Sequence, residues 1–309
     1  MTVRGIGLGL LGCAASYLAA GPEAKPGPAT PFFWATMAER DGSAPAIGHA
    51  LERGGALPSI WMRTANWHFV NGDPKSGLLA LRSVLSATGE WDRPVFSTAV
   101  RLSPDIPSVL ENAIGDRRSG EALLRFLLNE DRIEESGMAW GWLQRRGWAG
   151  AELGDLYMNR LIDDKLLEAA WEARGSKALL LDPGFEEPPG QRGFRWIAAR
   201  APVNRDSGNR HGGVSSLRVG GCVFQRTILR GAAYSLTGWI KGGPVHVQVF
   251  DEAHEGAGYS LNVGRSSDHW TRFRLPINKT GGVRLVQVRV EVVSGEAWLD
   301  DFALESGNG

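Results

Sequence analysis

The chain has 309 residues, 43% of them hydrophobic, and this length and apolar content suffice for two domains with separate cores. Thirty-four basic residues balance thirty-four acidic ones without a run rich in Lys or Arg, so no nucleic-acid partner is expected. Twelve Trp is a high count, typical of sugar-stacking and interface sites but also of helical cores.

Residues 1–20 resemble an export signal. Arg4 supplies the positive start, and the stretch after it is uncharged and largely apolar, yet short for a membrane span. Residues 10–13 (LLGC) also match a bacterial lipobox, so two outcomes stay open: cleavage near residues 15–20, or lipidation at Cys13. Only the second would attach the protein to a membrane. We expect an exported protein that is periplasmic, extracellular or an outer-membrane lipoprotein.

A helical region is expected after a linker rich in Pro and Gly at residues 21–33. From residue 34 to residue 179 the apolar residues follow helical periodicity. Pro58 and Pro74 are well placed to open two helices, because proline suits the first helical position. Four more apolar stripes predict helices, and they begin at Leu123, Ile133, Leu153 and Leu167.

Two segments of the helical region repeat one another. Residues 131–136 (DRIEES) and 164–169 (DKLLEA) lie 33 residues apart in matching positions. The region therefore resembles degenerate tetratricopeptide repeats, with three helix pairs at most. The pattern departs from that family between Asp92 and Pro107, where three prolines occur. The resemblance implies that the helical domain contacts a protein partner.

No motif for catalysis stands out. Residues 251–254 spell DEAH, but a helicase box needs a phosphate-binding loop ending in Gly-Lys-Ser/Thr, which the sequence lacks. The six His show no metal-ligand spacing, and no Gly-x-Ser-x-Gly elbow occurs. Adjacent acidic pairs such as Asp300 and Asp301 point apart on a strand and do not form the facing pair that glycoside hydrolysis requires. We therefore expect a protein that is not an enzyme.

The periodicity becomes strand-like near Leu180. Short β-branched runs recur between Gly-rich breaks as far as residue 306, a spacing typical of a sandwich or jelly roll. Apolar residues alternate with polar or aromatic ones, so each strand should have one apolar face and one mixed face. The predicted fold class is multidomain α and β: helical hairpin repeats over 34–179, followed by a β-sandwich jelly roll over 180–306.

Several short stretches of the strand region together resemble a known family. They are residues 183–186 (PGFE), 216–219 (SLRV), Gln225, 234–239, Trp270 and 298–301 (WLDD). This order is similar to that of the galactose-binding-like jelly-roll carbohydrate-binding modules attached to xylanases and related bacterial enzymes. The resemblance covers about two fifths of the chain and implies a module that binds sugar.

The same resemblance implies a structural calcium ion that joins the first and last strands. The matching positions are Glu186 and Asp300. Oxygen ligands from chain segments brought together by the fold suit a hard cation. The alternative interpretation is a capped strand end whose carboxylates are solvated.

Sugar binding also needs aromatic rings and planar polar groups on one sheet face. The candidate ligand-binding residues, each opposite the apolar face of its strand, are Trp239, His246, Gln248, Asn262, Gln287, Arg289 and Glu291. The alternative is that this face is only the solvated side of a sandwich, with Trp239 covered by a loop or by the helical domain.

The sequence thus predicts an exported, non-catalytic protein whose helical repeats contact a protein partner and whose jelly roll contacts glycan. Proteins that combine these two resemblances look like accessory factors of bacterial polysaccharide synthesis, export or surface assembly. One alternative is an interaction scaffold with a purely structural jelly roll. Another is a glycan-acting enzyme whose site lies between the domains.

Overall fold

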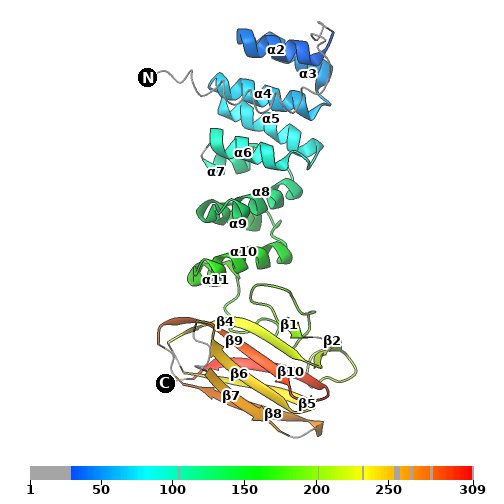
Figure 1. Ribbon diagram of the computed structural model, residues 1–309, viewed down its shortest axis with the longest axis vertical. Helices are drawn as coiled ribbons and strands as arrows, with labels where there is room; N and C mark the ends of the chain where they lie inside the picture. The colour runs from blue at the N-terminus through cyan, green and yellow to red at the C-terminus, as the bar shows by residue number, and fades with distance from the viewer. Residues whose placement is uncertain are drawn as a thin grey trace. The chain divides into compact units, whose positions relative to one another are not determined.

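The computed structural model describes most of the chain after residue 28 (Figure 1). The described ranges are 29–103, 105–200, 202–231, 233–253, 258–264, 267–278 and 281–307. The predicted export signal, Cys13 and most of the predicted linker therefore lie outside the described residues. The chain divides into two compact units, residues 1–149 and 150–309. None of the helices in the described ranges is both long enough and apolar enough to span a bilayer.

The described part of the chain contains ten α-helices, which follow one another in five consecutive pairs (Figure 1). In the first unit they are α2 (Pro31–Asp41), α3 (Ala44–Gly54), α4 (Pro58–Val70), α5 (Pro74–Ala87), α6 (Asp92–Leu102), α7 (Ile106–Asn112), α8 (Arg117–Asn129) and α9 (Ile133–Arg145). In the second unit they are α10 (Ala151–Asp163) and α11 (Leu167–Ala173). Helical hairpins before a β region are therefore confirmed, but the limit of three pairs is wrong.

The prolines that seemed to interrupt the repeats explain this difference. Pro94 lies in the first turn of α6, and Pro107 lies at the start of α7. The N–H groups of a first turn have no intrahelical acceptor, so proline costs little there. In the same way Thr30 caps α2 and Pro31 opens it, so this helix begins inside the predicted linker.

One turn geometry recurs between paired helices. Gly72, Asp131 and Lys165 adopt left-handed backbone conformations, with φ of 77°, 58° and 61°. In each case the next residue donates its N–H to a carbonyl five residues earlier; the pairs are Asp73–His68, Arg132–Leu127 and Leu166–Leu161. The two repeated sequence segments therefore correspond to the same Schellman-type helix end.

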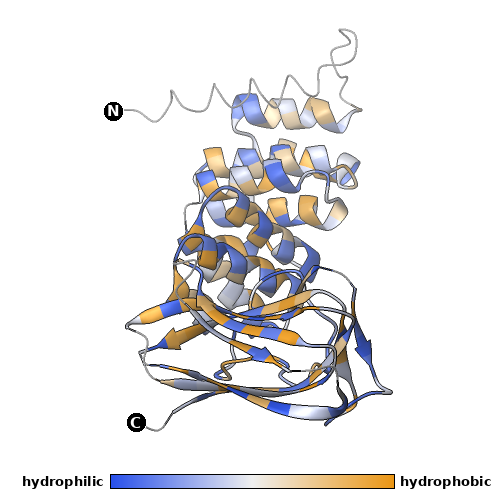
Figure 2. Cartoon of the chain, turned by 60° about the horizontal axis from the view of Figure 1, so that its bottom comes forward, coloured by the Kyte–Doolittle hydropathy of each residue, from blue (hydrophilic) through white to orange (hydrophobic). Residues whose placement is uncertain are grey.

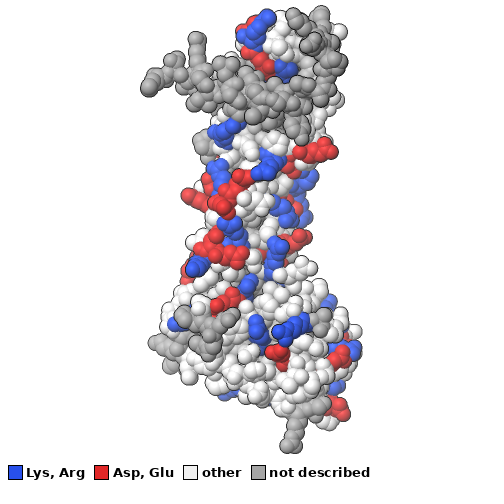
Figure 3. Space-filling model, viewed as in Figure 1, with Lys and Arg blue, Asp and Glu red and all other residues white. Residues whose placement is uncertain are grey.

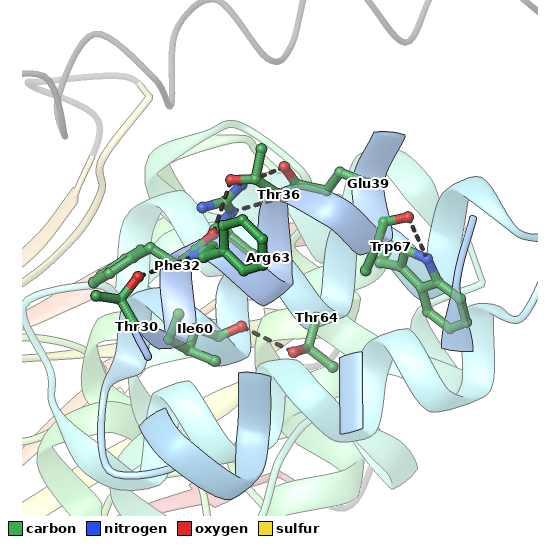
Figure 4. Close-up of polar contacts among 10 residues, drawn as sticks. Thr30, Phe32, Thr36, Glu39, Ile60, Arg63, Thr64 and Trp67 are labelled. Atoms are coloured by element: carbon green, nitrogen blue, oxygen red, sulfur yellow. Dashed lines mark hydrogen bonds and ion pairs between the residues drawn. The ribbon is translucent and has the colours of Figure 1, made fainter. Parts of the chain in front are cut away.

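In the first unit, polar contacts fasten α4 to α2 (Figure 4). The Arg63 guanidinium forms an ion pair with Glu39 and also donates to Thr36 Oγ1 over 2.9 Å. Trp67 Nε1 donates to the carbonyl of Ala38 over 3.1 Å. Because the Arg63 and Glu39 side chains are only about one fifth exposed, this pair fixes the helices more firmly than a fully solvated ion pair would.

The described residues of the second unit form ten strands in two five-stranded sheets. The strands are β1 (Ile197–Arg200), β2 (Val203–Asp206), β3 (Ser216–Val219), β4 (Cys222–Arg230), β5 (Tyr234–Gly242), β6 (Val245–Asp251), β7 (Gly258–Val263), β8 (Ser267–Ile277), β9 (Val283–Val292) and β10 (Ala297–Ser306). Sheet A has the order β1-β4-β9-β6-β7, and sheet B has the order β2-β3-β10-β5-β8. Pairing between these strands is antiparallel throughout.

The two sheets enclose one apolar core. Along the strands hydrophobic and hydrophilic residues alternate (Figure 2). In β6, for example, Val247 and Val249 are buried while Gln248 between them is not, and Val288 and Val290 of β9 are fully buried. A period of two sends successive side chains to opposite faces, so the valines fill the interior. The predicted β-sandwich is confirmed.

Helices α10 and α11 belong to the same compact unit as the sandwich. Trp171 of α11 meets the ring of Phe194 edge-on, with 5.7 Å between centroids. Arg230 of β4 forms an ion pair with Glu168, and Arg226 Nη1 donates to Asn159 Oδ1 over 3.3 Å. The compact units thus divide at residues 149 and 150, ahead of the change in periodicity near Leu180.

Candidate functional site

The outer face of sheet A carries six of the seven predicted ligand-binding residues. The strand registers place the outward side chains of β4, β9, β6 and β7 in three rows. The rows are Glu291–His246–Asn262, Phe224–Arg289–Gln248–Ser260 and Arg226–Gln287–Phe250. Opposed residues of an antiparallel pair lie about 5 Å apart, so each row is a continuous strip of neighbouring side chains. We call this surface the A face.

One end of the A face holds a hydrogen-bonded network. Glu252 Oε1 accepts from Arg226 Nε over 2.8 Å and from Gln287 Nε2 over 2.7 Å. The other end of the Gln287 amide, Oε1, accepts from Arg289 Nη2 over 3.0 Å. The chain of contacts therefore fixes the orientation of the Gln287 amide and, through it, that of the Arg289 guanidinium.

Arg289 lies in the middle row of the A face. Its guanidinium carbon is 4.8 Å from the centroid of the Phe250 ring, a cation–π contact. Its Nε is buried and has no hydrogen-bond partner among the described residues. A buried donor without an acceptor is costly, so this atom marks a position where a ligand atom or water would be favoured.

The other end of the A face has unused hydrogen-bonding capacity. His246, Gln248 and Asn262 form no side-chain hydrogen bond with other residues in the described ranges. His246 and Gln248 are half-buried and Asn262 is exposed. Such groups, on the same face as the rings of Phe224 and Phe250, can donate to and accept from sugar hydroxyls while the rings contact the apolar C–H surface of a sugar.

Trp239 does not belong to the A face, and the expectation that it shares a surface with the other six residues is wrong. It lies on β5 in sheet B, directly opposite Asp300 of β10 and Arg272 of β8. Its ring stacks on His211 with 4.0 Å between centroids and 18° between planes. Strand alternation predicts which side of a sheet a residue faces, but it does not say to which sheet the strand belongs. The loop that carries His211 covers Trp239.

Glu186 and Asp300 hold that same loop in place. Glu186 Oε1 accepts from the Val214 N–H over 2.8 Å, and its Oε2 accepts from the Ser215 hydroxyl over 3.1 Å. Asp300 Oδ2 accepts from the N–H of His211 over 2.7 Å and from that of Gly212 over 3.1 Å, and its Oδ1 accepts from the Asp301 N–H. Burial raises the pKa of Asp300, and these backbone N–H groups act against that rise.

The surroundings of Glu186 and Asp300 show whether they suit the calcium ion that the resemblance implies. All four carboxylate oxygens already accept a hydrogen bond. The described residues contain no group of three His, Cys, Asp or Glu side chains that could hold a metal ion. The two side chains therefore form a hydrogen-bonded clamp on this loop. Calcium binding stays a prediction.

Several residues that form or border the A face were not predicted as site residues, and they are Phe224, Arg226, Phe250, Ser260 and Glu252. Phe224 and Arg226 alternate with buried residues of β4, and Phe250 has the same parity along β6 as His246. That parity was the signal that could have identified them. Glu252 was part of the DEAH sequence, whose His254 lies outside the described residues; here its carboxylate pairs with Arg226.

No protein-family model and no curated protein sequence matches the chain. Among solved structures, it is similar to the carbohydrate-binding module TmCBM61 in complex with β-1,4-galactotriose, at 21% identity over 43% of this chain and 100% of that chain, with a TM-score of 0.34. It is similar to the xylan-binding CBM22-1 domain from Paenibacillus barcinonensis Xyn10C, at 16% identity over 42% and 97% of the two chains, with a TM-score of 0.34. It is also similar to a cyclase from Fischerella sp. TAU, at 13% identity over 43% of this chain and 98% of that chain, with a TM-score of 0.33. The residues of the A face therefore have to carry the functional proposal.

Proposed function

We propose that the β-sandwich binds glycan across the A face and that the protein is not catalytic. The observation that carries this proposal is that Gln248, His246 and Asn262, whose hydrogen-bonding groups are unused, share one sheet face with the half-buried rings of Phe224 and Phe250. A sugar laid across the face could therefore meet both hydrogen-bonding groups and aromatic carbon.

Glycan-array binding of the full chain tests this proposal. Gln248→Ala and Asn262→Ala should each weaken binding by about threefold to tenfold, the net value of one or two hydrogen bonds. Thr237→Ala, on the outer face of sheet B, is the matched control and should leave the affinity unchanged. The bound glycan should be recovered intact, since no catalytic motif was found. If the protein bound no glycan, the better interpretation would be an interaction scaffold whose jelly roll is purely structural.

We infer further that the helical hairpins contact a protein partner. Support comes from the run of consecutive helix pairs, because stacked pairs present a series of helix faces suited to binding proteins. Acidic and basic residues are interspersed over these helices in the view of Figure 3, which does not suggest a nucleic-acid surface. Cross-linking of the full chain, compared with a variant lacking residues 29–149, would show whether a partner depends on these helices.

We also propose that the protein is exported and acts in polysaccharide synthesis, export or surface assembly. The support is the sequence of residues 1–20 together with the proposed glycan site. After expression in a bacterium, the mature protein should begin between Cys13 and Gly21, and replacement of Cys13 by Ser should abolish any attached lipid. An exported product that retains Met1 would contradict the proposal.

A further inference from the structure

The charges of the A face are almost balanced, and the exception is its central arginine. Arg226 pairs with Glu252 over 2.8 Å, and Arg200 lies 3.4 Å from Glu291. The two described carboxylates of this face, Glu252 and Glu291, are therefore each already paired with a guanidinium. Arg289 forms no ion pair with any described residue; among those residues its only hydrogen bond is to the neutral amide of Gln287.

The position of Arg289 suits a ligand. It lies between Phe224 of β4 and Gln248 of β6 in the middle row of the face. Contacts with the Phe250 ring and the Gln287 amide hold its planar group in place. Because the group is oriented before any ligand arrives, less side-chain entropy is lost on binding.

The chemistry of a guanidinium then narrows the class of glycan. A planar fork of N–H donors matches the two oxygens of a carboxylate, and such charge-assisted bonds are about twice as strong as neutral ones. A neutral sugar laid across the face would displace water from Arg289 and leave its charge uncompensated, which is unfavourable. A carboxylate would pair with the charge through the terminal N–H groups of the guanidinium.

We propose that the glycan bound by the A face is acidic, with carboxylate groups of the uronic-acid type, and that Arg289 recognises the carboxylate. This inference rests on the proposed glycan-binding function. Gln248, His246 and Asn262 then contact hydroxyl groups of the same sugar or its neighbour, and the rings of the face pack against its C–H surface. The carboxylates of Glu252 and Glu291 do not repel the ligand strongly, because each is paired with its own arginine.

Matched pairs of polysaccharides test the inference. Polygalacturonate, alginate and hyaluronan would each be compared with the same polymer after its carboxyl groups have been reduced to hydroxymethyl groups. Affinity electrophoresis of the full chain should show at least one acidic polymer bound tenfold or more tightly than its reduced form. Binding of the acidic polymer should weaken as the NaCl concentration rises, since salt screens the exposed charge pair.

Two substitutions assign the preference to Arg289. Arg289→Gln should remove the difference between the acidic polymer and its reduced form, whereas Arg289→Lys should keep part of it, because the charge remains and the fork is lost. Arg274→Gln, on the outer face of sheet B, removes the same charge elsewhere and should change nothing. Circular dichroism would confirm that each variant is folded.

The possible failures are distinct. Equal binding of acidic and reduced polymers, or a preference for the reduced ones, would overturn the inference while glycan binding stood. A preference for sulfated over carboxylated polymers would overturn the choice of carboxylate. Binding to no polymer in either form, and to no glycan on the array, would overturn the proposed function together with the inference.

Discussion

Gln225 holds the backbone of Leu181 with both ends of its side-chain amide. Oε1 accepts from the Leu181 N–H over 3.0 Å, and Nε2 donates to the Leu181 carbonyl over 2.8 Å. Gln225 is fully buried, so the segment that enters the sandwich from the helices has its polar groups satisfied by one side chain of β4.

Replacement of Gln225 by Leu should therefore destabilise the second unit by roughly 2–4 kcal/mol, because two partly buried backbone groups lose their partners and the site loses its fit. The measurement is the denaturant midpoint of the β-sheet circular dichroism signal. Gln248→Leu, an equal change on the A face, should have little effect on that midpoint. Similar midpoints for the two variants would show that the Gln225 contact contributes nothing.

Trp239 offers a second test, because the structure assigns it a structural role. Trp239→Ala removes the stack on His211 and loosens the loop that Asp300 holds. We expect a loss of roughly 1–3 kcal/mol in stability, the range for a partly buried aromatic side chain. Glycan affinity at the A face should be unchanged. Loss of affinity in a fully stable variant would return Trp239 to the binding site.

These residues show how much of the fold and of the site the sequence could predict. Alternation in β6 and β9 predicted correctly that His246 and Arg289 face away from the valines, because that depends only on a period of two. Assignment of Trp239 needed the order of strands in each sheet, which depends on long-range pairing such as that of β5 with β10. A local pattern carries no information about such pairing.

Other features of the site could not be predicted because they depend on contacts between segments that are far apart in the sequence. The hydrogen-bond network of Glu252 depends on a turn residue meeting β4 and β9, and no spacing rule predicts that. The cover over Trp239 depends on His211, which lies in a loop between two strands. Helix α7 was missed because proline was taken as a breaker where it occupies the start of a helix.

The clamp formed by Glu186 leads to a third prediction. Glu186→Ala frees the Val214 N–H and the Ser215 hydroxyl, and should lower the melting temperature by several degrees. If hydrogen bonds alone form the clamp, chelator should have no effect on the wild-type protein. A melting temperature that rises with added calcium in the wild type, but not in Glu186→Ala, would instead support the calcium ion implied by the resemblance.

The limits of the folded unit can be tested with two fragments. Residues 150–309 retain the contacts of Trp171 with Phe194 and of Glu168 with Arg230, whereas residues 180–309 lose both. We expect both fragments to show β-sheet circular dichroism and the longer one to melt at a higher temperature. Equal melting temperatures would place the boundary near Leu180, as the change in periodicity suggests. A disordered shorter fragment would show that the last two helices are required for folding.

The last prediction concerns pH and Asp155 of α10. Burial raises the pKa of this carboxyl to about 6, and the carboxylates of Glu152 and Glu187 act in the same direction, while Arg195 at 3.9 Å opposes them. The folded state thus binds the proton more tightly than the unfolded state, in which the pKa is near 3.8. The stabilisation is complete below that value and is lost as the pH rises through about 6.

The unfolding free energy of the second unit should therefore fall by about 2 kcal/mol between pH 4 and pH 7.5 on account of this group. Asp155→Asn should flatten that part of the profile and be more stable than the wild type at pH 7.5, since the neutral amide needs no desolvated charge. Asp163→Asn, an exposed position on the same helix, is the control and should keep the wild-type profile. If Asp155→Asn were instead less stable at pH 7.5, attraction to Arg195 would outweigh burial, and the direction of the pKa shift would be reversed.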